Sequence, residues 1–77
     1  MPSKTDALIS AITKLIRSGE YAPGDKLPSG REMCERYDVA MMVVRMAVER
    51  LRAAGLVTTT PGSGIYVADP LPPDRPE

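Results

Sequence analysis

The sequence contains no histidine, no tryptophan and no phenylalanine, and it has a single cysteine, Cys34. One cysteine excludes a disulfide within the chain, and without histidine the usual Cys/His zinc patterns cannot form. No pair of acidic residues falls in a predicted pocket, and the serine that could serve as a nucleophile, Ser29, is better explained as a helix cap. These absences argue against an enzyme, a metal site and a cofactor, and we expect Cys34 to be a small buried side chain.

The chain also lacks an excess of charge and a long apolar run. Its 10 basic and 10 acidic residues give a net charge of zero, whereas nucleic-acid-binding domains are usually basic. No apolar run approaches the roughly 18 residues that a membrane-spanning helix needs. The N-terminal residues MPSKTDALIS lack the apolar core of a signal peptide. We expect a soluble cytoplasmic protein that makes no membrane contact, and charge alone does not decide whether it binds DNA.

Apolar side chains recur at helical spacing in three stretches of this 77-residue chain. The stretches predict helices over residues 5–18, 29–37 and 40–54. Thr5 or Asp6 can cap the first helix, because short polar side chains accept the unpaired backbone N–H groups of a first turn. The core must therefore come from aliphatic side chains and methionine on these helices.

Local signals mark where the helices begin and end. Ser29 and Glu32 have the spacing of a capping box, in which the hydroxyl accepts the Glu32 amide and the carboxylate reaches back. Gly19 and Gly55 fit the stop positions after the first and third helices. Asp38 tolerates the left-handed backbone of a tight turn between the second and third helices. This turn predicts a helix-turn-helix.

A β-hairpin is predicted after the helices. The runs at residues 56–60 and 65–68 are rich in β-prone side chains and flank the turn sequence PGSG at residues 61–64. Residues 69–77 hold four prolines and are typical of an extended linker or a frayed tail. Three helices and a hairpin predict a winged helix-turn-helix of the α+β, mainly α class over residues 5–68.

Several strings resemble the GntR-type winged-helix domain. They are SGEYAPGDKLPS at residues 18–29, Arg31-Glu32, ERY at residues 35–37, Arg45, Ala47, GLV at residues 55–57, Pro61-Gly62 and Gly64. The resemblance covers roughly residues 5–68. It implies a bacterial transcription regulator, as a repressor, that binds palindromic operator DNA as a homodimer. The family normally carries a C-terminal effector domain, so an effector ligand is expected only if such a domain follows. The resemblance leaves open whether the chain is an excised domain or a short regulator.

The chain departs from the family pattern at the start of the third helix. Where the family has GVSRxTVRxAL, this chain has DVAMMVVRMAV, so that Ala40, Met41 and Val43 replace serine, arginine and threonine. Ala40 removes the usual N-cap, which costs about 1 kcal/mol. Gly30 replaces the glutamate of LPSERE and raises the backbone entropy of the second helix.

Two arginines are the main candidates for DNA contact. Arg31, near the start of the second helix, is disfavoured by the helix dipole, which hints at an external anion such as a phosphate, or at a guanine edge. Arg45 on the third helix can bind guanine through two hydrogen bonds, the commonest specific contact in the major groove. The alternatives are a solvated surface position for Arg31 and an intrahelical pair between Arg45 and Glu49.

The predicted hairpin tip supplies further candidates. Gly62, Ser63 and Gly64 can let the backbone approach a phosphate or the minor groove, although turn chemistry alone also explains them. Thr60 can donate to a phosphate or be a plain strand residue. Lys26 and Ser29, at the entry to the second helix, complete the predicted contacts, with a plain surface charge as the alternative for Lys26.

Three methionines on the third helix, Met41, Met42 and Met46, allow four interpretations. They can contact thymine methyl groups, form an adaptable protein-binding surface, belong to the core, or be substitutions that disable DNA binding. We include Met41 and Met42 among the DNA-binding candidates. The alternative function is a protein-interaction module that uses this methionine-rich surface.

Overall fold

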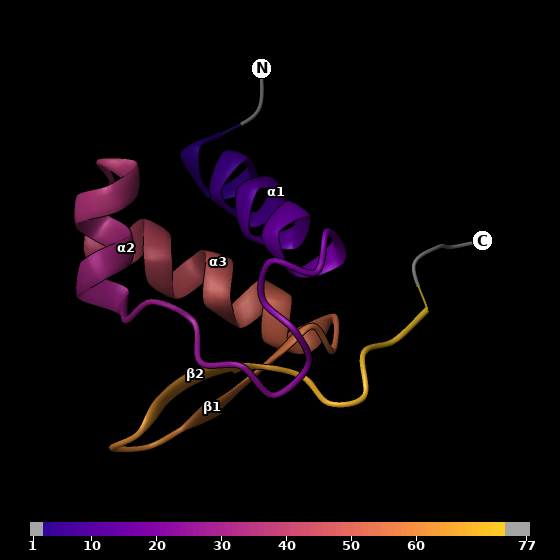
Figure 1. Cartoon of the computed structure of the whole chain (residues 1–77). Helices are drawn as coiled ribbons and strands as arrows, with labels where there is room; N and C mark the ends of the chain where they lie inside the picture. The colour runs from indigo at the N-terminus through magenta and orange to yellow at the C-terminus, as the bar shows by residue number, and fades with distance from the viewer. Residues whose placement is uncertain (1–2, 74–77) are drawn as a thin grey trace.

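A computed structural model describes residues 3–73 of the chain. In chain order its elements are α1 (Lys4–Arg17), α2 (Gly30–Tyr37), α3 (Met41–Ala53), β1 (Val57–Thr60) and β2 (Gly64–Val67). The antiparallel hairpin of β1 and β2 lies along one side of α3 (Figure 1). No helix in this part of the chain is long and apolar enough to cross a membrane. The predicted winged helix-turn-helix is confirmed, and each helix begins and ends within one residue of the expected position.

The core lies between α1, α3 and the base of the hairpin. Its main buried side chains are Leu8, Ile12 and Ile16 of α1, Met33 of α2, Val44, Ala47 and Leu51 of α3, and Leu56, Val57 and Val67 of the hairpin. The spacing of the α1 and α3 members places them on one face of each helix, where burial contributes about 25 cal/mol per Å² of apolar surface. Cys34, expected to be buried, is half-buried against this core.

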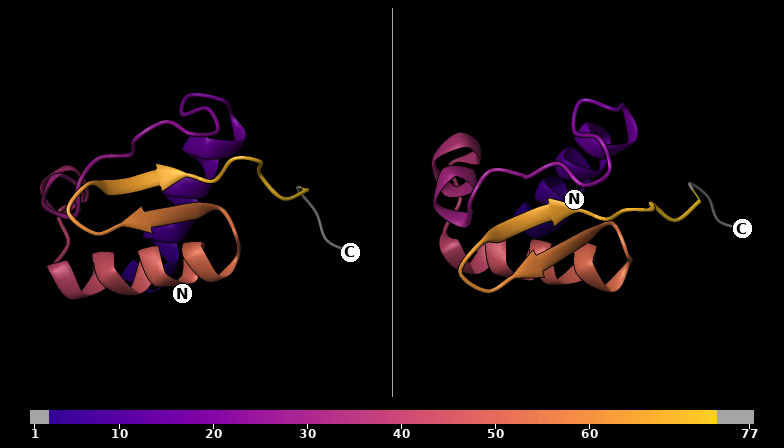
Figure 2. Two further views of the ribbon diagram at one scale, coloured as in Figure 1. Left: turned by 90° about the horizontal axis from the view of Figure 1, so that it is seen from below. Right: turned by 60° about the horizontal axis from the view of Figure 1, so that its bottom comes forward.

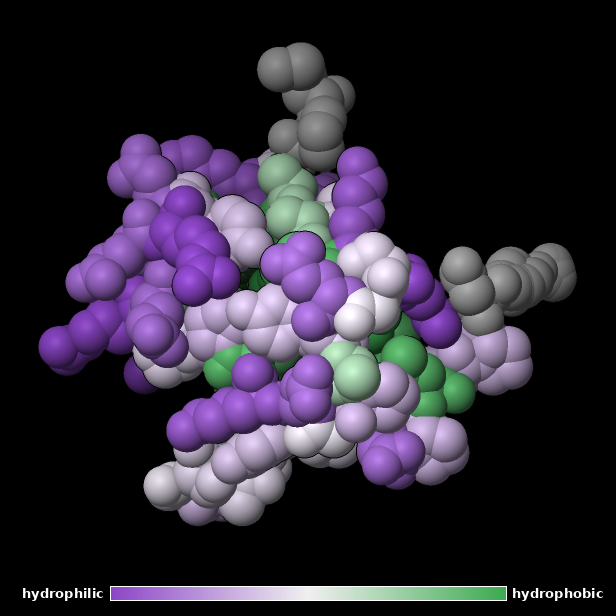
Figure 3. All heavy atoms as spheres, viewed as in Figure 1, coloured by the Kyte–Doolittle hydropathy of each residue, from purple (hydrophilic) through white to green (hydrophobic). Residues whose placement is uncertain are grey.

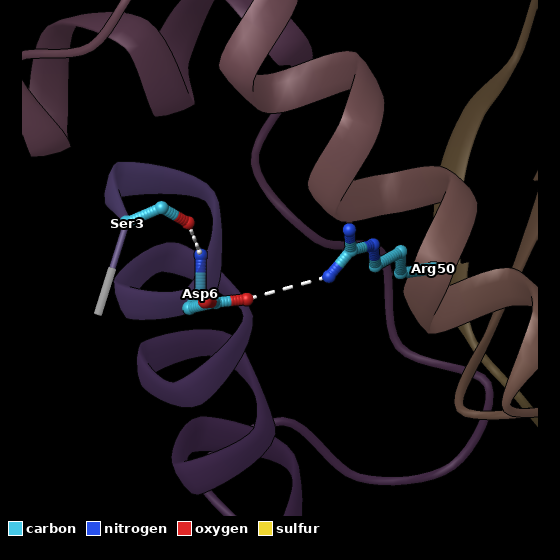
Figure 4. Close-up of polar contacts among 3 residues, drawn as sticks. All are labelled: Ser3, Asp6 and Arg50. Carbon is cyan, nitrogen blue, oxygen red and sulfur yellow. Dashed lines mark hydrogen bonds and ion pairs between the residues drawn. The ribbon is translucent and has the colours of Figure 1, made fainter. Parts of the chain in front are cut away.

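The start of α1 differs from the prediction. The helix begins at Lys4, and the Ser3 hydroxyl accepts the Asp6 backbone N–H at 3.0 Å, so the prediction that Thr5 or Asp6 is the cap is wrong. The Ser3 hydroxyl can reach the otherwise unpaired N–H of Asp6 three residues later, which is the spacing that an N-cap needs. The Asp6 carboxylate instead pairs with Arg50 of α3, with 3.3 Å between Oδ1 and Nη1 (Figure 4).

The capping box of α2 and the turn after it are confirmed. The Glu32 N–H donates to the Ser29 hydroxyl at 3.1 Å, and the Ser29 N–H donates to the Glu32 carboxylate at 2.8 Å. Asp38 ends α2 in the left-handed region, with φ 53° and ψ 55°. Ala40 stands at the N-cap of α3 and makes no side-chain hydrogen bond there, as its methyl group requires.

The hairpin is tied to the loop before α2. Val57 of β1 pairs with Val67 of β2, and the loop residues Asp25 and Leu27 hydrogen-bond to the other edge of β2. The Val67 N–H donates to Asp25 O, and the Leu27 N–H donates to Ile65 O, both at 2.8 Å. Figure 2 shows this loop running beside β2, so the hairpin is held on both sides rather than standing alone.

The described part of the predicted linker, residues 69–73, contacts the core and the end of α1. Leu71 packs against the core, and the Arg17 guanidinium donates to the Pro72 carbonyl at 2.9 Å. The end of this segment lies on the side of the molecule away from the hairpin tip (Figure 1). Residues 74–77 of the predicted linker lie outside the described residues, and the boundary at residue 68 stays a prediction.

Candidate nucleic-acid interface

Three elements meet at one end of the molecule. The helix α2, the first turns of α3 and the tip of the hairpin all lie at the left in Figure 1, and both views of Figure 2 keep them together. We call this region, residues 26–31, 41–45 and 60–64, the wing end. It contains every residue predicted to contact DNA. Hydrophilic side chains gather over α2 on the same side (Figure 3).

A groove runs between α3 and the hairpin at this end. It has a volume of about 320 Å³. Its lining residues are Gly30 of α2, Met41, Val44, Arg45, Val48, Glu49 and Arg52 of α3, and Thr59 and Ile65 of the hairpin. Two of the predicted contact residues, Met41 and Arg45, therefore flank the same hollow, with strand residues as its opposite wall.

Arg45 is exposed in the second turn of α3 and does not form the ion pair with Glu49 that its spacing allowed. Glu49 binds Arg52 instead, through two hydrogen bonds, of which the one between Arg52 Nε and Glu49 Oε1 is 3.2 Å. The Arg52 guanidinium lowers the pKa of Glu49, and the carboxylate raises that of Arg52. Within residues 3–73 no ion pair holds Arg45, so its charged group is available for an external acceptor.

Arg31 is the second residue of α2 and is exposed. Its neighbour Glu32 is engaged in the capping box, where the Ser29 backbone N–H, more than the Ser29 hydroxyl, lowers the pKa of Glu32. In the described chain no acidic side chain pairs with Arg31. The helix dipole does not stabilise a cation at the start of a helix. Arg31 is therefore better suited to binding an external anion than to stabilising α2.

Lys26 and the hairpin tip are in contact. Gly64 has φ 145°, and a Cβ at this position would lie 2.8 Å from Lys26 Cε. Glycine is therefore required at residue 64 by the backbone, and a Cβ there would also force the flexible end of the Lys26 side chain to move. The Lys26 stem thus follows the wing, at the same end of the molecule as Arg31 and Arg45.

The rest of the tip is built by turn chemistry. The Ser63 N–H donates to the Thr60 carbonyl at 2.9 Å, and the Ser63 hydroxyl shares a hydrogen bond with the Tyr66 hydroxyl. Gly62 has φ 76° and open space around it. Thr60, Gly62 and Ser63 are all exposed, so their structural role leaves them accessible to a ligand.

The three methionines are exposed, which makes the core interpretation wrong for them. Met41, Met42 and Met46 keep 41%, 66% and 45% of their surface, whereas Met33 keeps 1%. Met41 lies over the first residue of α2, since its Sδ atom is 3.3 Å from the position of a Cβ on Gly30. The two departures from the family pattern, at residues 30 and 41, are therefore neighbours in space.

Sequence reasoning missed these contacts between elements. The pairing of Gly30 with Met41 had a signal, because both positions depart from the same family motif, but one sequence does not tell which departures touch. For the contact of Lys26 with Gly64, the glycine itself was the only signal in the sequence. No cluster of three or more potential metal-ligating side chains occurs within residues 3–73.

Comparisons with known proteins agree on one family. The family model described as bacterial regulatory proteins, gntR family, matches residues 4–67. The Uxu operon transcriptional regulator of Escherichia coli (strain K12) is 47% identical over 58 residues, which are 75% of this chain and 23% of that protein. The galactonate operon transcriptional repressor of the same organism is 32% identical over 66 residues, 86% of this chain and 29% of that protein.

The fold is also that of solved DNA complexes. The crystal structure of AraR(DBD) in complex with operator ORR3 matches with a TM-score of 0.87 and 28% identity, over 88% of this chain and 82% of that chain. The present chain spans about a quarter of the length of the two curated relatives.

Proposed function

We propose that this chain, which belongs to the gntR family of bacterial regulatory proteins, is the sequence-specific DNA-binding domain of a transcriptional repressor. The observation that carries the proposal is the meeting of α2, the start of α3 and the hairpin tip at one end of the molecule. A neighbour of the same fold has been solved with operator DNA. We keep residues 5–68 as the binding domain and residues 69–77 as the linker.

In the proposed complex α3 enters the major groove. Recognition helices contact base edges mainly through their N-terminal residues, which here are Met41, Met42 and Arg45. Arg45 binds a guanine edge through two hydrogen bonds. Two observations support this contact: Arg45 is exposed, and Glu49 is bound to Arg52 instead of to Arg45.

The remaining contacts position the domain on the DNA backbone. Arg31 and the backbone N–H groups around Ser29 at the start of α2 bind phosphates, since most contacts that fix register go to the backbone. Lys26 lies along the hairpin and adds a charge beside it. Thr60, Gly62, Ser63 and Gly64 form a wing that reaches the adjacent minor groove. The closeness of Lys26 to Gly64 supports treating the wing as one basic projection.

The proposal includes a homodimer on a palindromic operator. Two copies of α3 would lie about 34 Å apart, one turn of DNA, so that each reads one half-site. The described chain ends on the side away from the wing, so it would not obstruct the DNA in such a complex (Figure 1). An effector ligand enters the proposal only through a further domain. Operator DNA lies in the bacterial cytoplasm, and so would the protein.

Selection from a random duplex library at low salt tests the function. We expect a short site to be enriched, and the logarithm of its affinity to fall linearly with the logarithm of salt concentration as counterions are released. Arg45→Ala should cost about 1–3 kcal/mol and relax the preference at one base pair. The matched control is Arg50→Ala, on the same helix but paired with Asp6 of α1, which should leave the selected site unchanged. A folded domain that retains no duplex contradicts the proposal and favours the protein-interaction module instead.

A further inference from the structure

The first turn of α3 carries no side chain that can read hydrogen-bonding groups. Its N-cap is Ala40, and the helix then begins Met41, Met42, Val43. The first hydrogen-bonding side chain of the helix is that of Arg45. Because base contacts come mainly from this end of a recognition helix, whatever α3 reads before Arg45 must be apolar.

Only one apolar group projects from a base edge into the major groove. Each base pair shows donors and acceptors there, and thymine adds its C5-methyl group. The minor groove offers no such methyl group. An apolar side chain that discriminates bases from the major groove therefore does so by contact with the methyl of thymine.

The two methionines are placed for such a contact. Met42 is the most exposed large apolar side chain of the described chain, at 66%. Met41 is held more firmly, since it lies over Gly30 and lines the groove together with Arg45. A Cβ at residue 30 would lie 3.3 Å from Met41 Sδ, so the methionine would have to shift by a few tenths of an ångström. Methionine is unbranched and polarizable, so it adapts well to a small apolar partner.

The charges around the methionines favour DNA over a protein partner. Arg31, Arg45 and Lys26 belong to the same end of the molecule. Glu32 and Glu49 are engaged in the capping box and in the pair with Arg52, whereas Glu35, four residues after Arg31 on α2, is exposed and forms no ion pair within residues 3–73. A small apolar patch framed by available cations fits a polyanion that carries methyl groups.

We propose that Met41 and Met42 read thymine methyl groups, so that the preferred half-site places thymine beside the guanine bound by Arg45. The proposal rests on the proposed DNA-binding function and adds its base preference. It assigns the two side chains a specificity role in place of the arginine and its neighbour in the family motif. Met46, exposed one turn further along α3, has no part in it.

Parallel selections with two random duplex libraries test the proposal, one made with thymine and one with deoxyuridine, which pairs identically but lacks the methyl group. We expect the thymine library to converge on a site with thymine at defined positions. The site should lose affinity about fourfold for each contacted methyl that is replaced by hydrogen, the effect of one buried methyl-sized group. The deoxyuridine library should converge weakly or not at all on those positions.

Variants then assign the effect to side chains. In Met41→Ala and Met42→Ala the penalty for deoxyuridine should disappear at one position each, whereas the matched control Met46→Ala should keep the full penalty. All three sites are exposed and alanine favours helix, so circular dichroism and thermal unfolding should show intact domains.

The outcomes separate the two proposals. If neither library is retained, the DNA-binding function itself fails. If both libraries converge on one site with equal affinity, or if all variants keep the same deoxyuridine penalty, the domain binds DNA and the methyl-reading proposal is overturned.

Discussion

Replacing Gly30 with alanine tests how the two departures from the family pattern are coupled. Gly30 is the first residue of α2 and does not have a positive φ, so alanine meets no backbone strain there. Alanine in place of a helical glycine stabilises by roughly 0.5–1 kcal/mol, because the unfolded chain loses freedom. The added Cβ would lie 3.3 Å from Met41 Sδ and 3.8 Å from Val44 Cγ1.

The first of these distances is tight, but it involves the end of a flexible side chain that is 41% exposed. Met41 can move by a few tenths of an ångström at small cost. We therefore expect Gly30→Ala to raise the free energy of unfolding by about 0.5 kcal/mol, or the melting temperature by about 2–4 °C for a domain of this size. In a Met41→Ala background the crowding is absent and the gain should approach 1 kcal/mol.

Urea unfolding of the two single variants and the double variant gives the coupling energy directly. Gly55→Ala is the matched control, since φ is 80° there and alanine should destabilise. If Gly30→Ala has the same effect in both backgrounds, Met41 does not lie where the Cβ would be, and the coupling argument is refuted. If it destabilises both, the glycine is required by the backbone and not merely permitted.

Three further changes test local features. Ala40→Ser should restore the missing cap of α3 and raise the free energy of unfolding by about 1 kcal/mol in urea melts; no gain would mean that this N-terminus is satisfied in another way. Gly64→Ala should destabilise by about 1–3 kcal/mol, because φ is 145° and the new Cβ meets the Lys26 stem, and a neutral result would contradict the wing geometry. The pKa of Glu32 is lowered in the folded state, so its ionised form stabilises at and above its ordinary pKa of 4.5 and loses this effect as the pH falls through the lowered folded pKa. Thermal melts from pH 6 to pH 3 should therefore show a smaller loss for Glu32→Gln than for the parent chain, and parallel curves would count against the capping box.

The elements of this fold are predictable because their signals are local. Gly19 and Gly55 have φ of 87° and 80°, and Asp38 has φ 53°, so each stop signal works through the backbone of its own residue. The capping box likewise lies within four consecutive residues, Ser29 to Glu32. The cap of α1 was predicted wrongly because short polar side chains lie close together there, and Ser3, which has the same chemistry as the predicted Thr5, is the one that caps.

One feature of the site also follows from a local rule. Glu49 has a cation on either side along α3, Arg45 four residues before and Arg52 three residues after. An acidic residue N-terminal to its basic partner agrees with the helix dipole, whereas the reverse order opposes it. Arg52 is therefore the better partner, and it is the one bound. The sequence thus contained the reason for which Arg45 stays available.

The contacts between elements needed the structure. Met41 lies at the edge of the apolar stripe of α3, where a small change in helix phase moves a side chain between core and surface. Its placement over Gly30 depends on how α2 crosses α3, which no spacing within one helix determines. The same holds for Lys26 and Gly64, because one lies in the loop before α2 and the other at the start of β2.

A net charge of zero is compatible with a DNA-binding surface because charges are not spread evenly. Three acidic side chains are engaged. Asp6 forms an ion pair with Arg50 of α3, Glu32 belongs to the cap of α2, and Glu49 forms a pair with Arg52 within α3. Arg31 and Arg45, by contrast, have no acidic partner within residues 3–73. Two cations without an acidic partner in the described chain therefore lie at the wing end, although the charges of the whole chain sum to zero. Total charge was for this reason a weak guide to where a polyanion can bind.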